Sequence, residues 1–221
     1  MIRHIRNVLQ ADELARLQSL AKVVRFVDGR MTNPDTSVKN NLQVPQNDPL
    51  ATEPGVLVRD ALMRHPELRA FAFPKQMARP TMVRYEPGMN YGWHVDEALF
   101  PSNPPMRSDL SCTVFLSPRG EYDGGELVIE LGQQTLSFKG DAGDAILYPS
   151  TTIHQVTPVT RGARLVAITW LQSWVADAAQ RELLLQIDEL RILEMASRRD
   201  ARALVLLESL RTNLFRMWSD T

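Results

Sequence analysis

The segment around residue 94 combines two side-chain types that bind metal ions. His94 and Asp96 lie two residues apart in the run from Tyr91 to Asp96, which has the composition of a β-strand. Because side chains in a strand alternate between its two faces, His94 and Asp96 are predicted to point the same way. An imidazole and a carboxylate on one face can share one small cation, so the pair predicts part of a metal site.

A third ligand has to come from elsewhere in the chain, and His154 is the candidate. It lies in a second strand-like run, residues 152 to 156, after a turn at Pro149-Ser150. Two histidines and one carboxylate make the facial triad of non-haem iron oxygenases, which leaves coordination positions open for a co-substrate and dioxygen.

Arg164 heads a further strand-like run, residues 164 to 170, whose alternation places it with Val166, Ile168 and Trp170 on one face. A charge at the head of an apolar face needs a partner, because burying an unpaired charge is costly. A 2-oxo acid can chelate the metal through its ketone and neighbouring carboxylate. Its far carboxylate then needs a fixed cation, and the guanidinium of Arg164 is suited to bind it with two hydrogen bonds.

Short runs rich in Val, Ile, Thr, Phe and Tyr, separated by turn clusters, fill residues 79 to 173 and predict a β core. About eight strands at this spacing favour a jelly-roll-like double sheet. The predicted strands are 80–85, 91–96, 110–116, 126–131, 134–138, 144–149, 153–157 and 164–171.

Helical periodicity dominates the two ends of the chain. Helices are predicted over 11–23 and 54–64, joined by a long irregular connection over 28–49, and the leucine rows after Ser173 predict two more, with Asp200 as the N-cap of the last. We therefore divide the chain into an N-terminal helical cover and irregular loop (1–78), a β core (79–173) and a C-terminal helical appendage (174–221). The C-terminal leucines fit a homodimer interface and a cover over the β core equally well.

Composition sets limits on the class of protein. The 221 residues are 44% hydrophobic and carry a net charge of -1, which is ordinary for a globular chain and gives no reason to expect nucleic acid or a membrane as partner. Cys112 is the one cysteine, and no stretch has the length and apolar character of a membrane span. A cytoplasmic location is expected.

The motifs together resemble a known family. The run Arg84-Tyr85-Glu86-Pro87-Gly88-Met89 followed by Tyr91, His94 and Asp96, then Asp123-Gly124-Gly125-Glu126-Leu127, Gly143-Asp144, Tyr148-Pro149-Ser150, His154 with Val156, and Thr160-Arg161-Gly162 with Arg164, resembles the bacterial PKHD-type hydroxylases. These are oxygenases related to prolyl 4-hydroxylases and dependent on iron and 2-oxoglutarate. The likeness runs through residues 79 to 173.

The resemblance implies a mainly β fold with flanking helices, built on a double-stranded β-helix (jelly-roll, cupin-like) core. It implies Fe(II) bound by His94, Asp96 and His154, and 2-oxoglutarate bound by Arg164, with Tyr85 as a second co-substrate contact. The implied reaction uses O2 to hydroxylate an amino-acid side chain, a peptide or a small metabolite, while 2-oxoglutarate is decarboxylated to succinate. Relatives commonly prefer ascorbate (vitamin C), and some bacterial members sit beside iron-uptake functions, so a siderophore-linked substrate is one candidate.

Other residues have simpler interpretations. By alternation Tyr91 and Trp93 face away from His94, Gly124-Gly125 is a hairpin turn, Arg161 is a solvated turn residue and Cys112 is a core residue. His4 and His65 are expected to have no chemical role.

Competing functions are distinguished by single positions. A nucleic-acid demethylase would resemble a pattern with a second arginine six residues after the first, where this chain has Trp170, and a halogenase would have a small residue in place of Asp96. A cupin-like metal-binding module, a metal-dependent isomerase or hydrolase would not require Arg164. A scaffold with a vestigial site would have no reason to keep all four residues.

Overall fold

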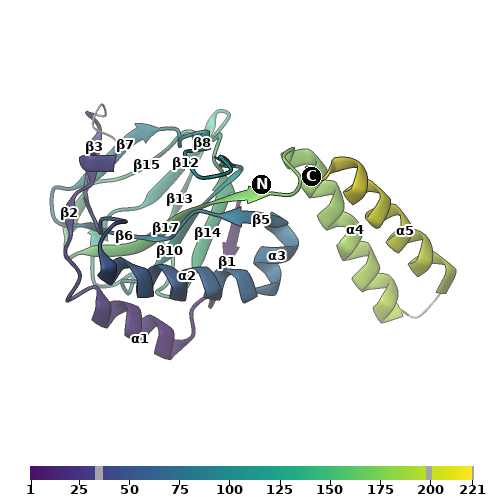
Figure 1. Cartoon of the computed structure of the whole chain (residues 1–221), viewed down its shortest axis with the longest axis horizontal. Helices are drawn as coiled ribbons and strands as arrows, with labels where there is room; N and C mark the ends of the chain where they lie inside the picture. The colour runs from purple at the N-terminus through teal and green to yellow at the C-terminus, as the bar shows by residue number, and fades with distance from the viewer. Residues whose placement is uncertain (33–36, 198–200, 221) are drawn as a thin grey trace.

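Two antiparallel β-sheets face each other, and three helices cover the outer side of the larger sheet (Figure 1). This computed structural model describes residues 1–32, 37–197 and 201–220. Each of the predicted runs between residues 79 and 173 forms a strand. The predicted fold, mainly β with flanking helices around a double-stranded β-helix core, is confirmed.

The sheets are built from segments that are far apart in the sequence. The larger sheet has the order β1 (Arg3–Ile5), β14 (Ala145–Pro149), β10 (Leu110–Phe115), β17 (Arg164–Ser173), β6 (Thr81–Tyr85), β4 (Leu42–Gln43) and β2 (Val27–Asp28), with β5 (Pro74–Met77) also on β17. The smaller sheet has the order β13 (Gln134–Phe138), β12 (Leu127–Leu131), β15 (His154–Val156), β7 (Asn90–His94) and β3 (Lys39–Asn40). Two ribbons complete the strands, β11 (Asp123–Gly124) with β16 (Val159–Arg161) and β8 (Leu99–Phe100) with β9 (Met106–Arg107).

Strand β10 shows why the larger sheet lies in the middle of the molecule. All six of its residues are buried. Cys112 and Val114 pack into the cluster shared with the helices, whereas Phe115 packs into the cluster between the sheets. Because side chains alternate along a strand, β10 has side chains on both faces of the larger sheet. Helices cover one face and the smaller sheet covers the other.

The N-terminal helices bury one apolar face each against this sheet. They are α1 (Ala11–Leu20), α2 (Thr52–Arg64) and α3 (Pro66–Ala72), with short 3₁₀ turns η1 (Gly29–Thr32) and η2 (Pro49–Ala51). Leu17 and Leu62 are fully buried there. The predicted end of the second helix at residue 64 is confirmed. Pro66 begins α3, a helix that was not predicted, and proline fits the first turn because no N–H is needed there.

The connection predicted as irregular over 28–49 also contributes strands. β3 and β4 lie within it, and β2 begins just before it. Each is two residues long, too short for alternation to be seen in the sequence, and each is fixed by a partner far along the chain: β3 pairs with β7 and β4 with β6. The strands of this connection thus extend one edge of each sheet.

Helices α4 (Ala178–Ser197) and α5 (Ala201–Trp218) form a hairpin that stands away from the sandwich (Figure 1). Its base is anchored by a small cluster in which Phe73, Val175 and Leu184 pack against Trp218 and its neighbours. Of the two alternatives left open for the C-terminal leucines, a cover over the β core is therefore not the one that the structure shows. The predicted cap at Asp200 lies outside the described residues.

Candidate active site

The three predicted metal ligands come together at one end of the smaller sheet. His94 ends β7 and His154 begins β15, and the two residues are directly paired across the strands. Asp96 lies two residues beyond the end of β7. Donor atoms of the three side chains lie within 4.8 Å of one another.

A β-bulge in β7 decides which side chains face this centre. His94 pairs with His154 but Tyr91 pairs with Val156, so β7 spans three residues where β15 spans two. The extra residue returns Tyr91 to the face of His94, and their rings stack with centroids 3.5 Å apart and planes 10° apart. The prediction that Tyr91 faces away is therefore wrong, while Trp93 does point outward and is 44% exposed.

Both histidines are oriented by their own backbone. The Nδ1 atom of His94 lies 2.7 Å from the carbonyl oxygen of Gly92, and that of His154 lies 3.0 Å from the carbonyl of Thr152. A carbonyl only accepts, so each Nδ1 carries the proton and each Nε2 keeps a lone pair for a metal. These Nε2 atoms lie 4.0 Å (His94) and 3.8 Å (His154) from the carboxylate oxygens of Asp96.

The surroundings favour the neutral form of the His94 imidazole. Burial lowers the pKa of His94 well below its usual value, and the nearby His154 lowers it further. Because a histidine must be deprotonated to ligate a metal, this shift favours metal binding.

Two serines that the sequence analysis missed hold the carboxylate. The hydroxyl of Ser111, on β10, donates to Oδ2 of Asp96, and the hydroxyl of Ser150 lies 2.8 Å from that of Ser111. Both serines are buried. Ser150 belongs to the motif Tyr148-Pro149-Ser150, but nothing in the sequence indicates that β10 and β14 place these hydroxyls behind Asp96.

Arg164 lies on β17, in the opposite sheet, and is only 1% exposed. Its guanidinium lies 5.1 Å from the ring centre of Tyr85 and 5.8 Å from that of Phe115, and its Nε has no hydrogen-bond partner among the described residues. Within the described residues no carboxylate lies at ion-pair distance from it. A buried guanidinium without an anion is unfavourable, so the site is built to receive a negative group.

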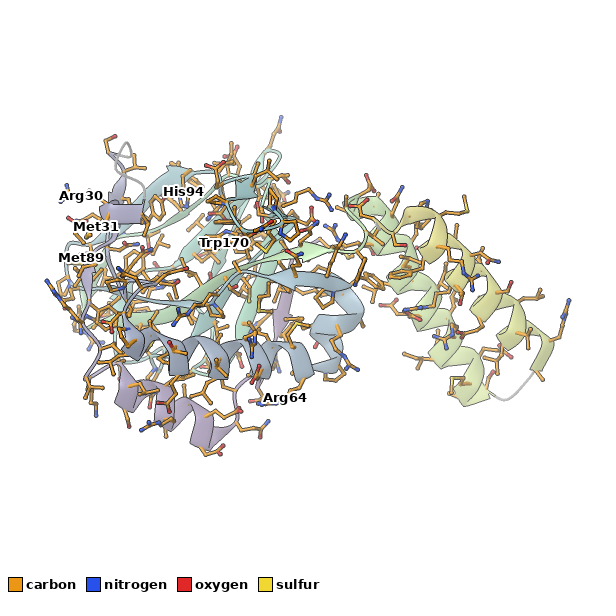
Figure 2. The ribbon with its side chains drawn as sticks, in the orientation of Figure 1. Arg30, Met31, Arg64, Met89, His94 and Trp170 are labelled. Carbon is orange, nitrogen blue, oxygen red and sulfur yellow. The ribbon has the colours of Figure 1, made fainter. Side chains whose placement is uncertain are left out.

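A cavity of about 680 Å³ connects the two groups, since His94, Asp96, His154 and Arg164 all line it. This volume is in the range of small-molecule sites. Tyr85 also lines the cavity, and its hydroxyl accepts a hydrogen bond of 3.0 Å from Asn41. Figure 2 shows His94 and Trp170 on the side of the sandwich away from Arg64, which lies among the covering helices.

Three more residues in the cavity wall were not predicted as site residues. Lys39 and Asn41 come from the short strand β3 and the residue after it. The indole Nε1 of Trp170 is buried and has no hydrogen-bond partner in the described part of the chain. Lys39 and Asn41 come from the connection whose strands are too short to recognise in sequence. Trp170 lies on the same face as Arg164, as the alternation predicts.

The arrangement fits an iron ion with a 2-oxo acid. Two imidazoles and one carboxylate are the facial donor set of non-haem iron, and a buried guanidinium with no anion among the described residues shares their cavity. One molecule with a chelating end and a carboxylate end would satisfy both.

The glycine pair at 124–125 is not a hairpin turn. β11 pairs with β16 rather than with β12. A Cβ at Gly124 would meet the carbonyl oxygen of Pro158 at 2.0 Å, and one at Gly125 would meet Cδ of Arg164 at 2.9 Å. Both have positive φ, so these glycines permit close backbone approach and leave room for Arg164.

The remaining residues have structural surroundings. Arg161 is exposed and paired with Asp123. Cys112 is buried in the core, which raises its thiol pKa. His4 contacts Asp144 at 2.7 Å, and His65 ends α2; neither lines the cavity.

Comparison with known proteins agrees with this geometry. The family model described as the 2OG-Fe(II) oxygenase superfamily matches residues 80–172. A PKHD-type hydroxylase of Sphingopyxis alaskensis is 43% identical, covering 96% of this chain and 97% of that protein. A PKHD-type hydroxylase of Phenylobacterium zucineum is 42% identical over the whole of both chains.

Among solved structures, a prolyl-4-hydroxylase of Pseudomonas putida is similar with a TM-score of 0.52 and 19% identity, covering 78% of this chain and 92% of that one. A prolyl hydroxylase of Trichoplax adhaerens has a TM-score of 0.56 and 14% identity, covering 77% and 82%.

The double-stranded β-helix and its His-Asp-His centre thus define an oxygenase dependent on iron(II) and 2-oxoglutarate. Within that class, the chain belongs to the PKHD-type hydroxylases. The resemblance seen in the sequence is confirmed, and the metal-binding module and the scaffold are set aside.

Proposed function

We propose that His94, Asp96 and His154 bind the iron of this enzyme and that Arg164 binds the far carboxylate of 2-oxoglutarate. The observation that carries the proposal is the buried guanidinium, which lines the cavity of the metal ligands and has no anion among the described residues. A protein that binds only a metal ion would not require the buried positive charge of Arg164.

The chain's own groups prepare the site for the reaction. The carbonyls of Gly92 and Thr152 fix the imidazole tautomers, and Ser111 fixes the carboxylate. When bound, iron and 2-oxoglutarate supply the oxidation of a C–H bond by O2, with succinate and carbon dioxide as the other products. We assign Tyr85 as a second contact of the co-substrate, since it lines the cavity beside Arg164. Ascorbate as a reductant remains a prediction.

The proposed substrate is an amino-acid side chain, free or in a peptide, or a small metabolite, including one linked to iron uptake. A peptide is supported by the similar Trichoplax adhaerens enzyme, whose structure holds a peptide fragment of hypoxia inducible factor. Nucleic acid is disfavoured because Trp170 stands where a demethylase pattern would place a second arginine.

We propose the same three-part division as the sequence suggests: 1–78, 79–173 and 174–221. The first part supplies strands as well as helices. No helix in the described part of the chain has the length and apolar character to cross a bilayer. We place the protein in the cytoplasm.

We propose that the α4–α5 hairpin is the interface of a homodimer. Large apolar side chains remain exposed along both helices, and α5 has no buried residue. Leu183, Leu190 and Leu193 follow a helical stripe on α4, as Leu206, Leu210 and Met217 do on α5. Such stripes are typical of helices that pack against another surface.

The assignment of Arg164 is tested by anaerobic titration of the iron(II)-loaded protein with 2-oxoglutarate, following the weak visible charge-transfer band of a chelated 2-oxo acid. We expect a band in the wild type, and a requirement for at least about tenfold more ligand in Arg164→Ala, because a charge-assisted contact is lost. Arg161→Ala is the control, since that exposed arginine lies outside the cavity.

A wild-type protein that binds iron(II) but shows no band would contradict the proposed function. Equal titration curves for the wild type and Arg164→Ala would contradict the role of Arg164 alone.

A further inference from the structure

A second buried cation lines the cavity and has no role in the function proposed above. Lys39, on the edge strand β3, is 7% exposed and belongs to the cavity wall. β3 pairs with β7, where Lys39 stands opposite Tyr91. Since Tyr91 stacks on His94, the amine of Lys39 lies on the metal side of the cavity. Arg164 lies on the other sheet.

The described surroundings of Lys39 use only part of the hydrogen-bond donor capacity of its amine. Its Nζ donates a hydrogen bond of 2.8 Å to Oγ1 of Thr32 and lies 5.4 Å from the ring centre of Tyr91. An ammonium has three protons to donate. No other hydrogen bond from Nζ is present within the described residues, so donor capacity remains.

No described carboxylate forms an ion pair with the amine of Lys39. Asp28 is bound to Arg30, whose Nε lies 3.0 Å from its Oδ2. Asp96 is held by Ser111 and faces the two histidines. Neither carboxylate lies at ion-pair distance from Nζ, nor does any other in the described part of the chain. Lysine is rarely buried without a partner, and the described residues around Lys39 supply no anion for it.

Thr32, which accepts the hydrogen bond from Lys39, is itself held by further contacts. Thr32 donates to the carbonyl of Gly29 at 2.9 Å and lies 3.0 Å from Oε1 of Gln43, which is itself buried. These contacts tie η1 to β4 behind the amine. Arg30 and Met31 of η1 are labelled to the left of His94 in Figure 2. Burial lowers the pKa of Lys39 to about 8, which leaves the amine mostly protonated near pH 7.

We propose that Lys39 binds a carboxylate of the substrate that is hydroxylated, on the metal side of the cavity and apart from the 2-oxoglutarate site. The inference rests on the proposed function, in which Arg164 is occupied by the co-substrate. A singly charged carboxylate fits better than a phosphate, because Asp96 and Glu97 also line the cavity and repel higher negative charge. The substrate class is thus an acidic amino acid, an acidic side chain of a peptide or a free C-terminal carboxylate.

The test uses the iron(II)- and 2-oxoglutarate-loaded protein without oxygen and a panel of N-acetyl amino acids, each paired with its primary amide. The two members of a pair differ in charge and hardly in shape. We expect at least one acid to bind the wild type about tenfold or more tightly than its amide. Lys39→Met should reduce that ratio to near one, and Lys39→Arg should keep most of it. Lys22→Met, which removes the same charge from an exposed position, should leave it unchanged.

Titration with 2-oxoglutarate in the same samples separates the possible failures. Normal 2-oxoglutarate binding by Lys39→Met shows that this variant is folded and that Lys39 is not a co-substrate residue. The proposal is overturned if no acid is preferred over its amide by the wild type, or if Lys39→Met keeps the preference. It is overturned as well if Lys39→Met loses 2-oxoglutarate as Arg164→Ala does. Failure of the wild type to bind 2-oxoglutarate would instead overturn the proposed function.

Discussion

At the scale of single residues, the centre depends on groups that do not touch the metal. Asp96 follows the end of β7, so its backbone is not held by the sheet, and the hydroxyl of Ser111 holds its Oδ2 atom instead. Ser150 in turn lies against Ser111 in a buried pair. A hydroxyl in this position restricts the rotation of the carboxylate and orients it toward the histidines.

Replacement of Ser111 by alanine should therefore weaken metal binding by about 10- to 100-fold, which is the usual effect of removing a group that orients a ligand. The measurement is equilibrium dialysis with Mn(II) or Fe(II). Ser197→Ala, at the end of α4, serves as the control because its hydroxyl donates to the carbonyl oxygen of Glu194 in the same helix. Unchanged affinity in Ser111→Ala would mean that Asp96 is positioned without the hydroxyl.

At the scale of elements, the crossing of the 123–125 segment with β17 sets the position of Arg164. Gly125 has a φ of +67°, and a Cβ there would lie 2.9 Å from Cδ of Arg164. Gly132 has a similar φ of +61° but nothing within 4 Å of the added atom. The two glycines therefore differ in contact and not in backbone conformation.

Gly125→Ala and Gly132→Ala should each lose about 1 kcal/mol of stability from the left-handed backbone. Only Gly125→Ala should also weaken 2-oxoglutarate binding, because Arg164 has to move. Urea unfolding and the charge-transfer titration measure the two effects. Equal co-substrate affinity in both variants would show that Arg164 tolerates the displacement.

Contacts between neighbours along the chain could be predicted from the sequence, whereas contacts between distant segments could not. Alternation placed Arg164 with Trp170 because it depends only on neighbours along a strand. His94 and Asp96 do lie together, although β7 ends at His94 and not at Asp96 as predicted. The same rule failed for Tyr91, since the bulge exists only through the pairing of β7 with β15. Ser111 and Lys39 could not be predicted, because their neighbours are set by pairings between distant segments.

At the scale of the whole molecule, the hairpin is the part least buried by the rest of the chain. It meets the body at its base through the cluster around Phe73 and a hydrogen bond from Nζ of Lys75 to the carbonyl oxygen of Asp220. Its exposed leucines would be stabilised by a second copy, at roughly 25 cal/mol for each Å² of apolar surface removed from water.

The wild type should accordingly run at twice its mass of 25.0 kDa in size-exclusion chromatography with light scattering. The double variant Leu190→Glu/Leu206→Glu should run as a monomer, because two charges would have to be buried in the interface. Val23→Glu, at an exposed apolar position after α1, is the matched control and should remain dimeric. A monomeric wild type at micromolar concentration would exclude the proposed dimer.

The two ends of the proposed co-substrate site belong to different sheets. His94 and His154 lie on the smaller sheet, and Arg164 lies on the larger one. A molecule held at both ends would link the two sheets across the cavity. Part of the rigidity of this enzyme would then come from bound 2-oxoglutarate. It would rise and fall with the concentration of this metabolite, which the enzyme consumes.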